Sequence, residues 1–172
     1  AVASGKVVFG SNDGHIYALN ANDGKTVWKH LTGNPVNSSP AIVDGVIYIG
    51  SHDTKAYAMD LESGNVIWQF NTEGRIESSP AVGGGTVFFG SDDGNFFAVD
   101  AKTGIEKWRY DTGVGFASSP ALAEGNVYVG SGDMNLYAFK QDTGEIDWKF
   151  QTNNRIDASP AIHNGVIYIG SL

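Results

Sequence analysis

Cysteine is absent from this chain of 172 residues, which excludes disulfide bonds, thiolate metal sites and cysteine nucleophiles. Basic side chains are scarce: 11 lysines and arginines stand against 19 aspartates and glutamates, so the net charge at pH 7 is −8. A surface of that sign repels phosphate backbones, and nucleic acid is not an expected partner. The longest apolar runs have four to five residues, too few to cross a bilayer, and we expect no membrane insertion.

Motifs of catalysis and metal binding are missing too. The chain has no serine-nucleophile motif, phosphate-binding loop or zinc signature. Its four histidines lack the close spacing of metal ligands. No segment has the apolar spacing of an amphipathic helix. These absences predict a protein that is not an enzyme, holds no metal ion and is built without helices.

What the chain does contain is a repeat of 40 residues over its whole length. A period of this length is typical of stacked units, none of which can bury its apolar faces alone. We therefore predict one repeat array over residues 1–172 rather than two domains. The residues that recur at this interval are Trp28, Trp68, Trp108 and Trp148, then Gly10, Gly50, Gly90, Gly130 and Gly170, and Pro40, Pro80, Pro120 and Pro160.

Each repeat carries the signals of an antiparallel β-sheet. In the second repeat, two apolar runs, Ala41–Val43 and Val46–Gly50, flank Asp44-Gly45. Such a pair favours a type I′ hairpin turn, because both central residues of that turn need positive φ. Third and fourth strands are predicted at about 55–60 and 65–71. Each repeat is thus expected to form a four-stranded meander.

The second strand of each repeat is apolar at successive positions, as in Val46-Ile47-Tyr48-Ile49. Because neighbouring side chains of a strand point to opposite faces, both faces of the sheet must be buried. Sheets stacked face to face around an axis meet this need, so the predicted fold is an all-β β-propeller. The repeat places four complete blades at about 1–32, 40–72, 80–112 and 120–152, with a spare hairpin at 160–172.

Four blades leave the size of the ring open. Three arrangements are compatible with the repeat: the array is part of a longer chain, two copies complete a ring, or four blades close alone. Wedges shaped for an eight-bladed ring would leave large apolar end faces, which do not stay in contact with water. We favour a partial ring, half of an eight-bladed assembly, that self-associates as a symmetric homodimer.

Residues 58–68 and 98–108 both read Ala-x-Asp-x-x-Ser/Thr-Gly-x-x-x-Trp. This segment resembles the tryptophan-docking motif of the PQQ-type (quinoprotein) β-propeller repeat family. The first copy departs from the motif at Asn20 and Asp23, and the fourth at Lys140. An indole after a tight glycine turn can lie flat between neighbouring units and donate its N–H to a backbone carbonyl. We therefore predict a structural docking role for Trp28, Trp68, Trp108 and Trp148.

The most variable part of the repeat is the connector before each repeated proline, which should line one end of the propeller channel. Arg75 lies two residues before Glu77, and Arg155 two residues before Asp157. Two interpretations stay open: a small anion or carboxylate bound by the guanidinium groups, or an arginine–carboxylate clasp within each loop. Together with Asn37 of the first connector, these are the candidate ligand-binding residues.

One aspartate per repeat lies in a turn at the same register. A calcium site is one interpretation of these turns, which include Asp92-Asp93-Gly94. The aspartates fall one to a blade, however, and no run matches a calcium-binding loop. We therefore predict that they cap their turns through Asx hydrogen bonds. The residues are Asp13, Asp53, Asp93 and Asp133.

For function we predict a non-catalytic scaffold that binds a protein or small ligand through channel-mouth loops, without a cofactor. One alternative is a fragment of a quinoprotein oxidoreductase that binds pyrroloquinoline quinone (PQQ) with calcium, or another ligand. In the dehydrogenases of the resembled family, however, PQQ needs a full ring and an aspartate near calcium. Another alternative is an engineered or excised repeat chain. The resemblance also implies an extracytoplasmic protein, periplasmic or secreted.

Overall fold

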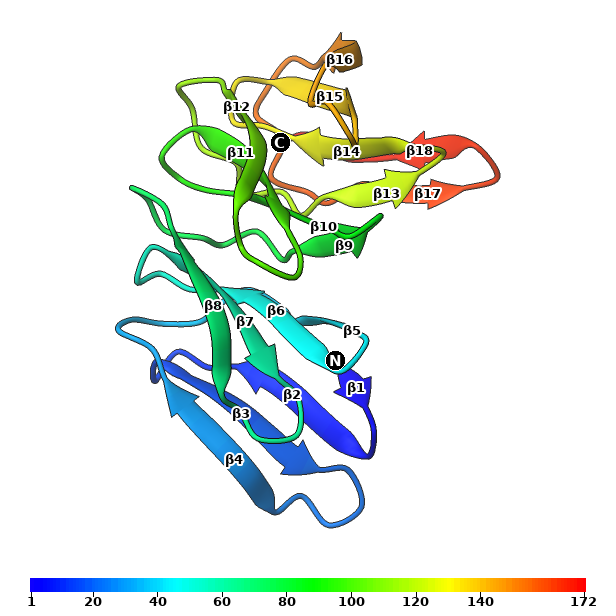
Figure 1. Ribbon diagram of the computed structural model, residues 1–172. Coiled ribbons are helices and arrows are strands. Elements are labelled where there is room, and N and C mark those ends of the chain that lie inside the picture. The colour runs from blue at the N-terminus through cyan, green and yellow to red at the C-terminus, as the bar shows by residue number, and fades with distance from the viewer.

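The computed structural model describes all 172 residues, and every regular element in it is a β-strand. The strands form four antiparallel four-stranded sheets and one two-stranded sheet, and within each sheet they lie side by side in chain order (Figure 1). The predicted all-β propeller of four complete blades and a spare hairpin is confirmed. The structure has no helix that could serve as a membrane span.

Each blade consists of four strands that follow one another in the chain. Blade 1 consists of β1 (Val2–Ala3), β2 (Lys6–Gly10), β3 (His15–Asn20) and β4 (Thr26–Leu31), and blade 2 of β5 (Ala41–Val43), β6 (Val46–Gly50), β7 (Lys55–Asp60) and β8 (Val66–Asn71). Blade 3 consists of β9 (Ala81–Gly83), β10 (Thr86–Gly90), β11 (Asn95–Asp100) and β12 (Glu106–Asp111), and blade 4 of β13 (Ala121–Ala123), β14 (Asn126–Gly130), β15 (Asn135–Lys140) and β16 (Ile146–Gln151). The spare hairpin is β17 (Ala161–His163) and β18 (Val166–Tyr168).

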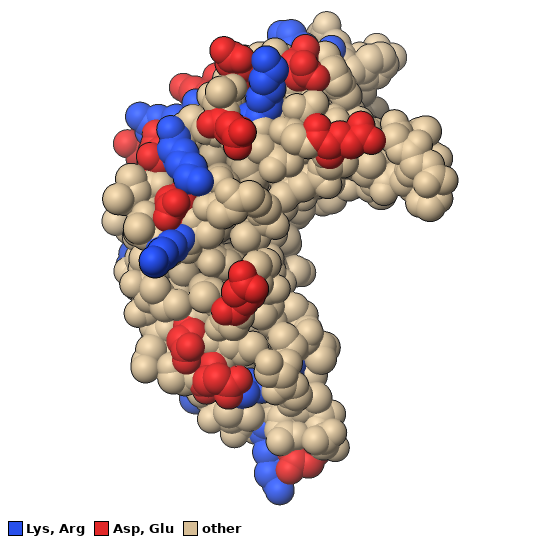
Figure 2. All heavy atoms as spheres, turned by 45° about the vertical axis from the view of Figure 1, so that its right-hand side comes forward, with Lys and Arg blue, Asp and Glu red and all other residues tan.

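The blades stand side by side along an arc. The short first strands of neighbouring blades lie against one another, β5 against β9, β9 against β13 and β13 against β17. These strands therefore form the inner rim, and the fourth strand of each blade lies outermost. Figure 2 shows the resulting crescent, which is hollowed on one side. The β17–β18 hairpin lies beside β13 and β14 and continues the arc as the first half of a further blade (Figure 1).

Tight turns join the first two strands of each blade and of the spare hairpin. Both central residues of every turn have positive φ, between 46° and 81°, as a type I′ turn requires. Asp44 and Glu124 adopt this conformation although they carry side chains, with φ of 50° and 51°. The predicted turn type is confirmed in all five hairpins.

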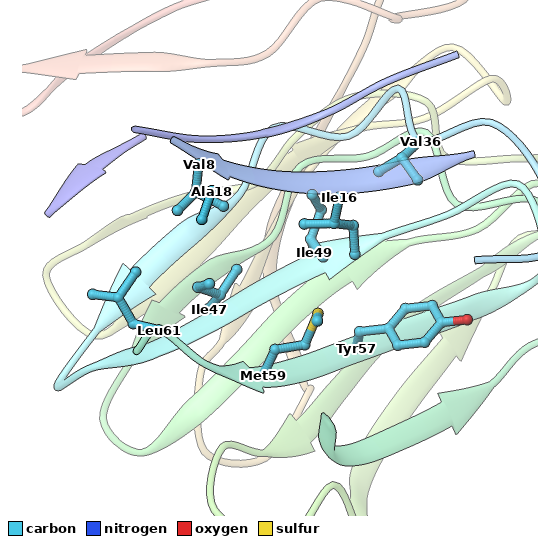
Figure 3. Packing of buried hydrophobic residues seen from close by; sticks show 9 residues of the cluster. All are labelled: Val8, Ile16, Ala18, Val36, Ile47, Ile49, Tyr57, Met59 and Leu61. Atoms are coloured by element: carbon cyan, nitrogen blue, oxygen red, sulfur yellow. The ribbon is translucent and has the colours of Figure 1, made fainter. Parts of the chain in front are cut away.

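Three hydrophobic clusters fill the spaces between the blades. Within β6, Ile47 and Ile49 belong to the cluster shared with blade 1, whereas Tyr48 belongs to the cluster shared with blade 3. One strand thus supplies two cores, as its unbroken apolar run predicted, and each buried aliphatic or aromatic side chain contributes about 1.5–3 kcal/mol. Figure 3 shows the first cluster, which comprises Val8, Ile16, Ala18, Val36, Ile47, Ile49, Tyr57, Met59 and Leu61.

The two end blades each leave apolar side chains in water. In blade 1, Phe9 of β2 is 38% exposed. In blade 4, every residue of the outermost strand β16 is exposed, and Phe150 reaches 63%. The blades between them bury both faces of their second and third strands. Phe9 and Phe150 are therefore left partly uncovered at the two ends of the arc.

Candidate functional site

Three of the four tryptophans dock on the blade that follows them. Their indole N–H groups donate to backbone carbonyls of the next blade at 2.9–3.0 Å, in the pairs Trp28–Leu61, Trp68–Ala101 and Trp108–Gln141. Each acceptor lies in the turn between the third and fourth strands. The glycine of that turn packs directly on the indole: a Cβ on Gly64, Gly104 or Gly144 would lie 2.6–2.7 Å from a ring carbon. These side chains hold the blades together.

Trp148 departs from this expectation. It is 38% exposed, whereas Trp68 is 9% exposed. The reason is positional, because each tryptophan docks on a turn of the following blade. After blade 4 the structure has only the β17–β18 hairpin, which lacks the turn between third and fourth strands. Docking within the chain is therefore limited to the other three tryptophans.

Side chains within the docking turn hold its corner. Asp60 Oδ1 accepts hydrogen bonds from the hydroxyl and the backbone N–H of Ser63, at 2.6 and 2.7 Å. Asp100 accepts the same two bonds from Thr103, both at 2.9 Å. Because these bonds favour the charged carboxylate, they lower the pKa of Asp60 and Asp100. A β-bulge also shifts the strand register beside every tryptophan, a feature that the sequence pattern did not reveal.

One aspartate per blade caps the turn between the second and third strands, as predicted. Each accepts the backbone N–H two residues ahead at 2.9–3.2 Å. In two of the blades the second carboxylate oxygen also accepts an N–H from the preceding connector, Gly33 to Asp53 and Glu73 to Asp93. The predicted Asx turns therefore also tie neighbouring blades together.

Asp13 has a further partner in Tyr17, whose hydroxyl donates to Oδ2 at 2.7 Å. This hydrogen bond is the main reason why the pKa of Asp13 is lowered to about 2, from an ordinary value of 3.8. Folding favours the charged form of Asp13, so this carboxylate stabilises the folded chain. Its contribution to stability is complete above about pH 3.8 and is lost as the pH falls through about 2.

The substitution Tyr17→Phe is expected to raise the pKa of Asp13 toward 3.8, because it removes the phenol donor and leaves the turn in place. A carbon-13 NMR titration of the Asp13 carboxyl measures this shift. Tyr168→Phe, which removes an exposed hydroxyl in the spare hairpin, is the control. An unchanged Asp13 pKa in Tyr17→Phe would assign the shift to the Ser11 side chain and to His15 instead.

The connectors of three blades meet around one hollow of about 770 Å³, termed here the connector hollow. The connector after blade 2 contributes Glu73, Gly74, Arg75 and Glu77. The connector after blade 3 contributes Val114, Gly115 and Ala117, and the connector after blade 4 contributes Arg155 and Asp157. Each connector leads from the outermost strand of one blade to the inner strand of the next. This path brings segments 40 residues apart in sequence to the same end of the molecule.

Charged side chains dominate the lining of the connector hollow. Arg75 Nε donates to Asp92 Oδ2 at 3.0 Å, and Arg155 Nη2 lies 2.7 Å from Asp157 Oδ2. The arginine side chains are 59% and 60% exposed, so their remaining N–H groups are accessible from water. The lining can therefore offer hydrogen-bond donors and acceptors of both charges to a bound molecule.

The two arginines differ in how they pair. Arg155 pairs with Asp157 in its own connector, the arrangement described by the second of the two interpretations. Arg75 does not pair with Glu77, and its partner is Asp92 in a turn of the next blade. Sequence analysis missed Asp92 because a partner across a blade interface has no fixed local spacing. The doubled aspartate of the third repeat was the available signal.

The remaining predicted residues have separate environments. Glu77 Oε1 lies 3.3 Å from His52 Nε2, on the border of the connector hollow. Asn37, in the first connector, is exposed and does not line the hollow. The hollow is thus built by blades 2 to 4 and their connectors, and blade 1 takes no part in it.

The chain has no group of side chains that matches the ligands of calcium-bound PQQ, the cofactor of the resembled dehydrogenases. No three His, Asp or Glu side chains lie close enough together to hold a metal ion. The indoles of Trp28, Trp68 and Trp108 already pack on turn glycines of the next blade. The residues present therefore do not fit a quinone held beside calcium.

Comparison of the sequence with family models identifies the repeat. The model described as outer membrane protein assembly factor BamB, built of PQQ-type repeats, matches residues 1–77 and 52–171. The chain belongs to this PQQ-type β-propeller repeat family. The two matches overlap and together leave only the last residue outside. No curated protein sequence matches this family member.

Solved structures share the fold of this PQQ-type chain. BamB from Moraxella catarrhalis has a TM-score of 0.87 at 22% identity, over 99% of this chain and 53% of that one. The computationally designed protein Ika8 has a TM-score of 0.88 at 14% identity, over 99% and 54%. Quinohemoprotein alcohol dehydrogenase ADHIIG from Pseudomonas putida HK5 has a TM-score of 0.76 at 22% identity, over 98% and 37%.

This PQQ-type chain therefore spans about half the length of the first two proteins and less of the third. At these identities the likeness is one of fold. It establishes how the blades stack, and it carries no activity, partner or origin from those proteins to this chain.

Proposed function

We propose that this PQQ-type chain is a non-catalytic interaction module that binds a protein or peptide segment in the connector hollow. The observation that carries the proposal is the convergence of three connectors, the part in which the repeats differ most, on one hollow. The repeated tryptophans and glycines, by contrast, pack between blades. Variable loops on a rigid scaffold are where such folds bind partners.

The charge of the connector hollow supports a particular kind of segment. Its acidic residues outnumber its basic ones by four to two, since Arg75 and Arg155 face Glu73, Glu77, Asp92 and Asp157. Glu73 forms no ion pair within the chain, so its carboxylate can accept from a basic side chain of the partner. We propose a segment of net positive charge, with backbone carbonyls that accept from the exposed guanidinium groups.

Binding is expected to weaken about tenfold or more when the hollow is made basic by Glu73→Lys with Glu77→Lys, because repulsion replaces attraction at the contact. The probe is a set of peptides selected from a random library on the immobilised chain, with dissociation constants measured by calorimetry. Asp142→Lys with Glu145→Lys makes the same change of charge on an exposed turn of blade 4 and is the control.

Two outcomes of this experiment count against the proposal. Selected peptides that bind both double variants equally would place the binding surface outside the connector hollow. Stoichiometric binding of PQQ with calcium, followed by absorbance in the same calorimetric series, would favour the alternative of a quinone-binding oxidoreductase fragment. The control variants keep the total charge equal, so long-range attraction does not account for a difference.

The proposal extends to location and to a second partner. The matched family is named after an outer-membrane assembly factor, which supports an extracytoplasmic location, periplasmic or secreted, for this chain as well. We also propose that the chain binds a second copy of itself through its end faces. The connector after blade 4 borders both the connector hollow and the C-terminal end of the arc, so the two surfaces meet at Arg155.

A further inference from the structure

The interface between neighbouring blades leaves one unmatched half at each end of the arc. At the C-terminal end, Trp148 is 38% exposed and has no docking turn. At the N-terminal end, the turn of blade 1 holds Ala21 and Gly24 at the positions that Ala101 and Gly104 occupy in blade 3. A Cβ on Gly24 would have no atom within 4 Å. The chain therefore has one tryptophan without a docking turn and one docking turn without a tryptophan.

Aromatic side chains repeat this relation. Phe70 of blade 2 packs on the stacked rings of Phe89 and Phe97 in blade 3, with centroid distances of 5.8 and 5.1 Å. Phe150 occupies the position of Phe70 in blade 4 and is 63% exposed. In blade 1, Phe9 and Tyr17 form the equivalent stacked pair at 5.4 Å, and no ring of a preceding blade covers them.

The inner rim carries a third unmatched pair. The backbone N–H of one serine per connector donates to the hydroxyl of its counterpart 40 residues on, at 2.8–3.0 Å, from Ser39 to Ser79, Ser79 to Ser119 and Ser119 to Ser159. The series begins with the free hydroxyl of Ser39 and ends with the free N–H of Ser159. If blade 1 of a second copy follows blade 4 of the first, the N–H of Ser159 can donate to the hydroxyl of Ser39 in that second copy.

The curvature of the arc suits a ring of twice its size. The four blades superpose on about half of BamB from Moraxella catarrhalis and about half of Ika8, with TM-scores of 0.87 and 0.88. A second arc of the same curvature can therefore meet both ends of the first at once. Two identical contacts related by a two-fold axis close the assembly and leave no end free for further growth.

The β17–β18 hairpin stands in the way of this contact. The N–H of Leu172 donates to Arg155 O at 3.2 Å, the bond that Asp92 makes to Arg75 O and Gly132 to Gly115 O in the complete blades. The hairpin thus occupies the place that residues 1–12 of a second copy would take. Its two strands leave Val166 and Tyr168 49% and 57% exposed, and an isolated two-stranded sheet is marginally stable.

Displacing the hairpin is easier than opening blade 1. The strand β2 pairs with β3 over five residues, from Lys6–Asn20 to Gly10–Ile16, and belongs to a complete four-stranded sheet. The hairpin pairs only with itself and contacts β13 at its inner edge. Blade 1 of a second copy therefore replaces the hairpin when it docks on blade 4. The hairpin and that blade compete for the same surface.

From these complementary surfaces we propose that two copies of the chain close one ring. Trp148 of each copy docks on the turn that contains Ala21 and Gly24 of the other copy. Phe150 of each copy packs on Tyr17 of the other. The β17–β18 hairpin is displaced in this dimer and weakens it by competing for the same place. This inference names the residues of the proposed self-association, and its test does not depend on peptide binding in the connector hollow. The occupant is a second copy because the contact continues the interface already present three times within the chain.

The test is sedimentation velocity of the full chain over a range of concentrations. We expect a monomer of 18.3 kDa that converts to a dimer. Gly24→Ala is expected to raise the dissociation constant of the dimer about tenfold or more, because the new Cβ collides with the incoming indole. Gly5→Ala is the matched control: Gly5 has φ of 71° and Gly24 has φ of 69°, and neither has an atom within 4 Å of an added Cβ.

Two more variants complete the experiment. Trp148→Ala removes the indole that docks on this turn and is expected to weaken the dimer as Gly24→Ala does. Ile167 occupies the position of Ile47, which belongs to the cluster shared with the preceding blade. We therefore expect Ile167→Asp to loosen the hairpin from blade 4, remove the competitor and strengthen the dimer. Circular dichroism confirms that each variant is folded before its mass is compared.

Each contrary outcome overturns the proposal in its own way. A folded Ile167→Asp variant that stays monomeric at all concentrations would exclude docking of Trp148 on blade 1 of a second copy. Equal dimerisation of Gly24→Ala and Gly5→Ala would place the contact on another surface, and species that grow beyond a dimer would exclude the closed ring. Peptide binding in the connector hollow is measured separately, so failure of one proposal leaves the other standing.

Discussion

Replacing Trp108 with alanine is expected to lower the free energy of unfolding by about 3–5 kcal/mol. The indole donates to Gln141 O at 2.9 Å and lies about 6 Å or less from the ring centres of Phe88, Phe96 and Phe139. Its removal leaves a cavity between blades 3 and 4 that the surrounding sheets cannot close. Urea unfolding followed by circular dichroism measures the loss without depending on tryptophan fluorescence.

Trp148→Ala is the matched control within the same chain. Trp148 follows the same turn motif in blade 4 but is 38% exposed and has no following blade to dock on. In dilute solution its replacement is expected to cost about 1 kcal/mol or less. Equal losses for Trp108→Ala and Trp148→Ala would show that the motif acts within its own blade and would contradict docking as the source of stability.

Replacing Gly90 with alanine is expected to destabilise the chain by about 3 kcal/mol, through overlap and not through backbone strain. Gly90 ends β10, and a Cβ there would overlap the Cβ of Phe116 and lie 2.7 Å from its carbonyl oxygen. Phe116 is fully buried between blades 3 and 4, so neither group can move aside cheaply. The same urea experiment measures the effect.

Gly170→Ala tests the same register position without the neighbour. A Cβ on Gly170 would meet no atom within 4 Å, because no further connector packs against it. Its replacement is expected to change the free energy of unfolding by about 0.5 kcal/mol or less. A large effect at both glycines would mean that the residue is needed for the conformation of the strand end itself.

Local strand and turn structure was predictable because it depends on neighbours in sequence. The strands expected at Ala41–Val43, Val46–Gly50 and 55–60 have those bounds as β5, β6 and β7. Turn glycines and alternation of side chains act over a few residues, and the repeat shows the same pattern again in each blade. The propeller followed from one further step, the need to bury both faces of each second strand.

The candidate site was predictable only in part. The connectors were expected to meet, because they occupy equivalent places in stacked blades, and they line one hollow. The pairing of Arg75 with Asp92 was not foreseen, since it crosses a blade interface. The exclusion of Asn37 from the hollow was likewise invisible, because no local signal tells which connectors of an open arc lie together.

The sequence by itself determined the repeating unit, its strands, its turns and the docking motif of each tryptophan, because these depend on short-range geometry repeated every 40 residues. Only the tertiary structure decided which copies of that unit have a neighbour. Trp28, Trp68 and Trp108 dock on a following blade while Trp148 does not. The same motif therefore stabilises the interior of the arc and leaves an exposed tryptophan at its end, because burial depends on what packs against a residue and not on its own sequence.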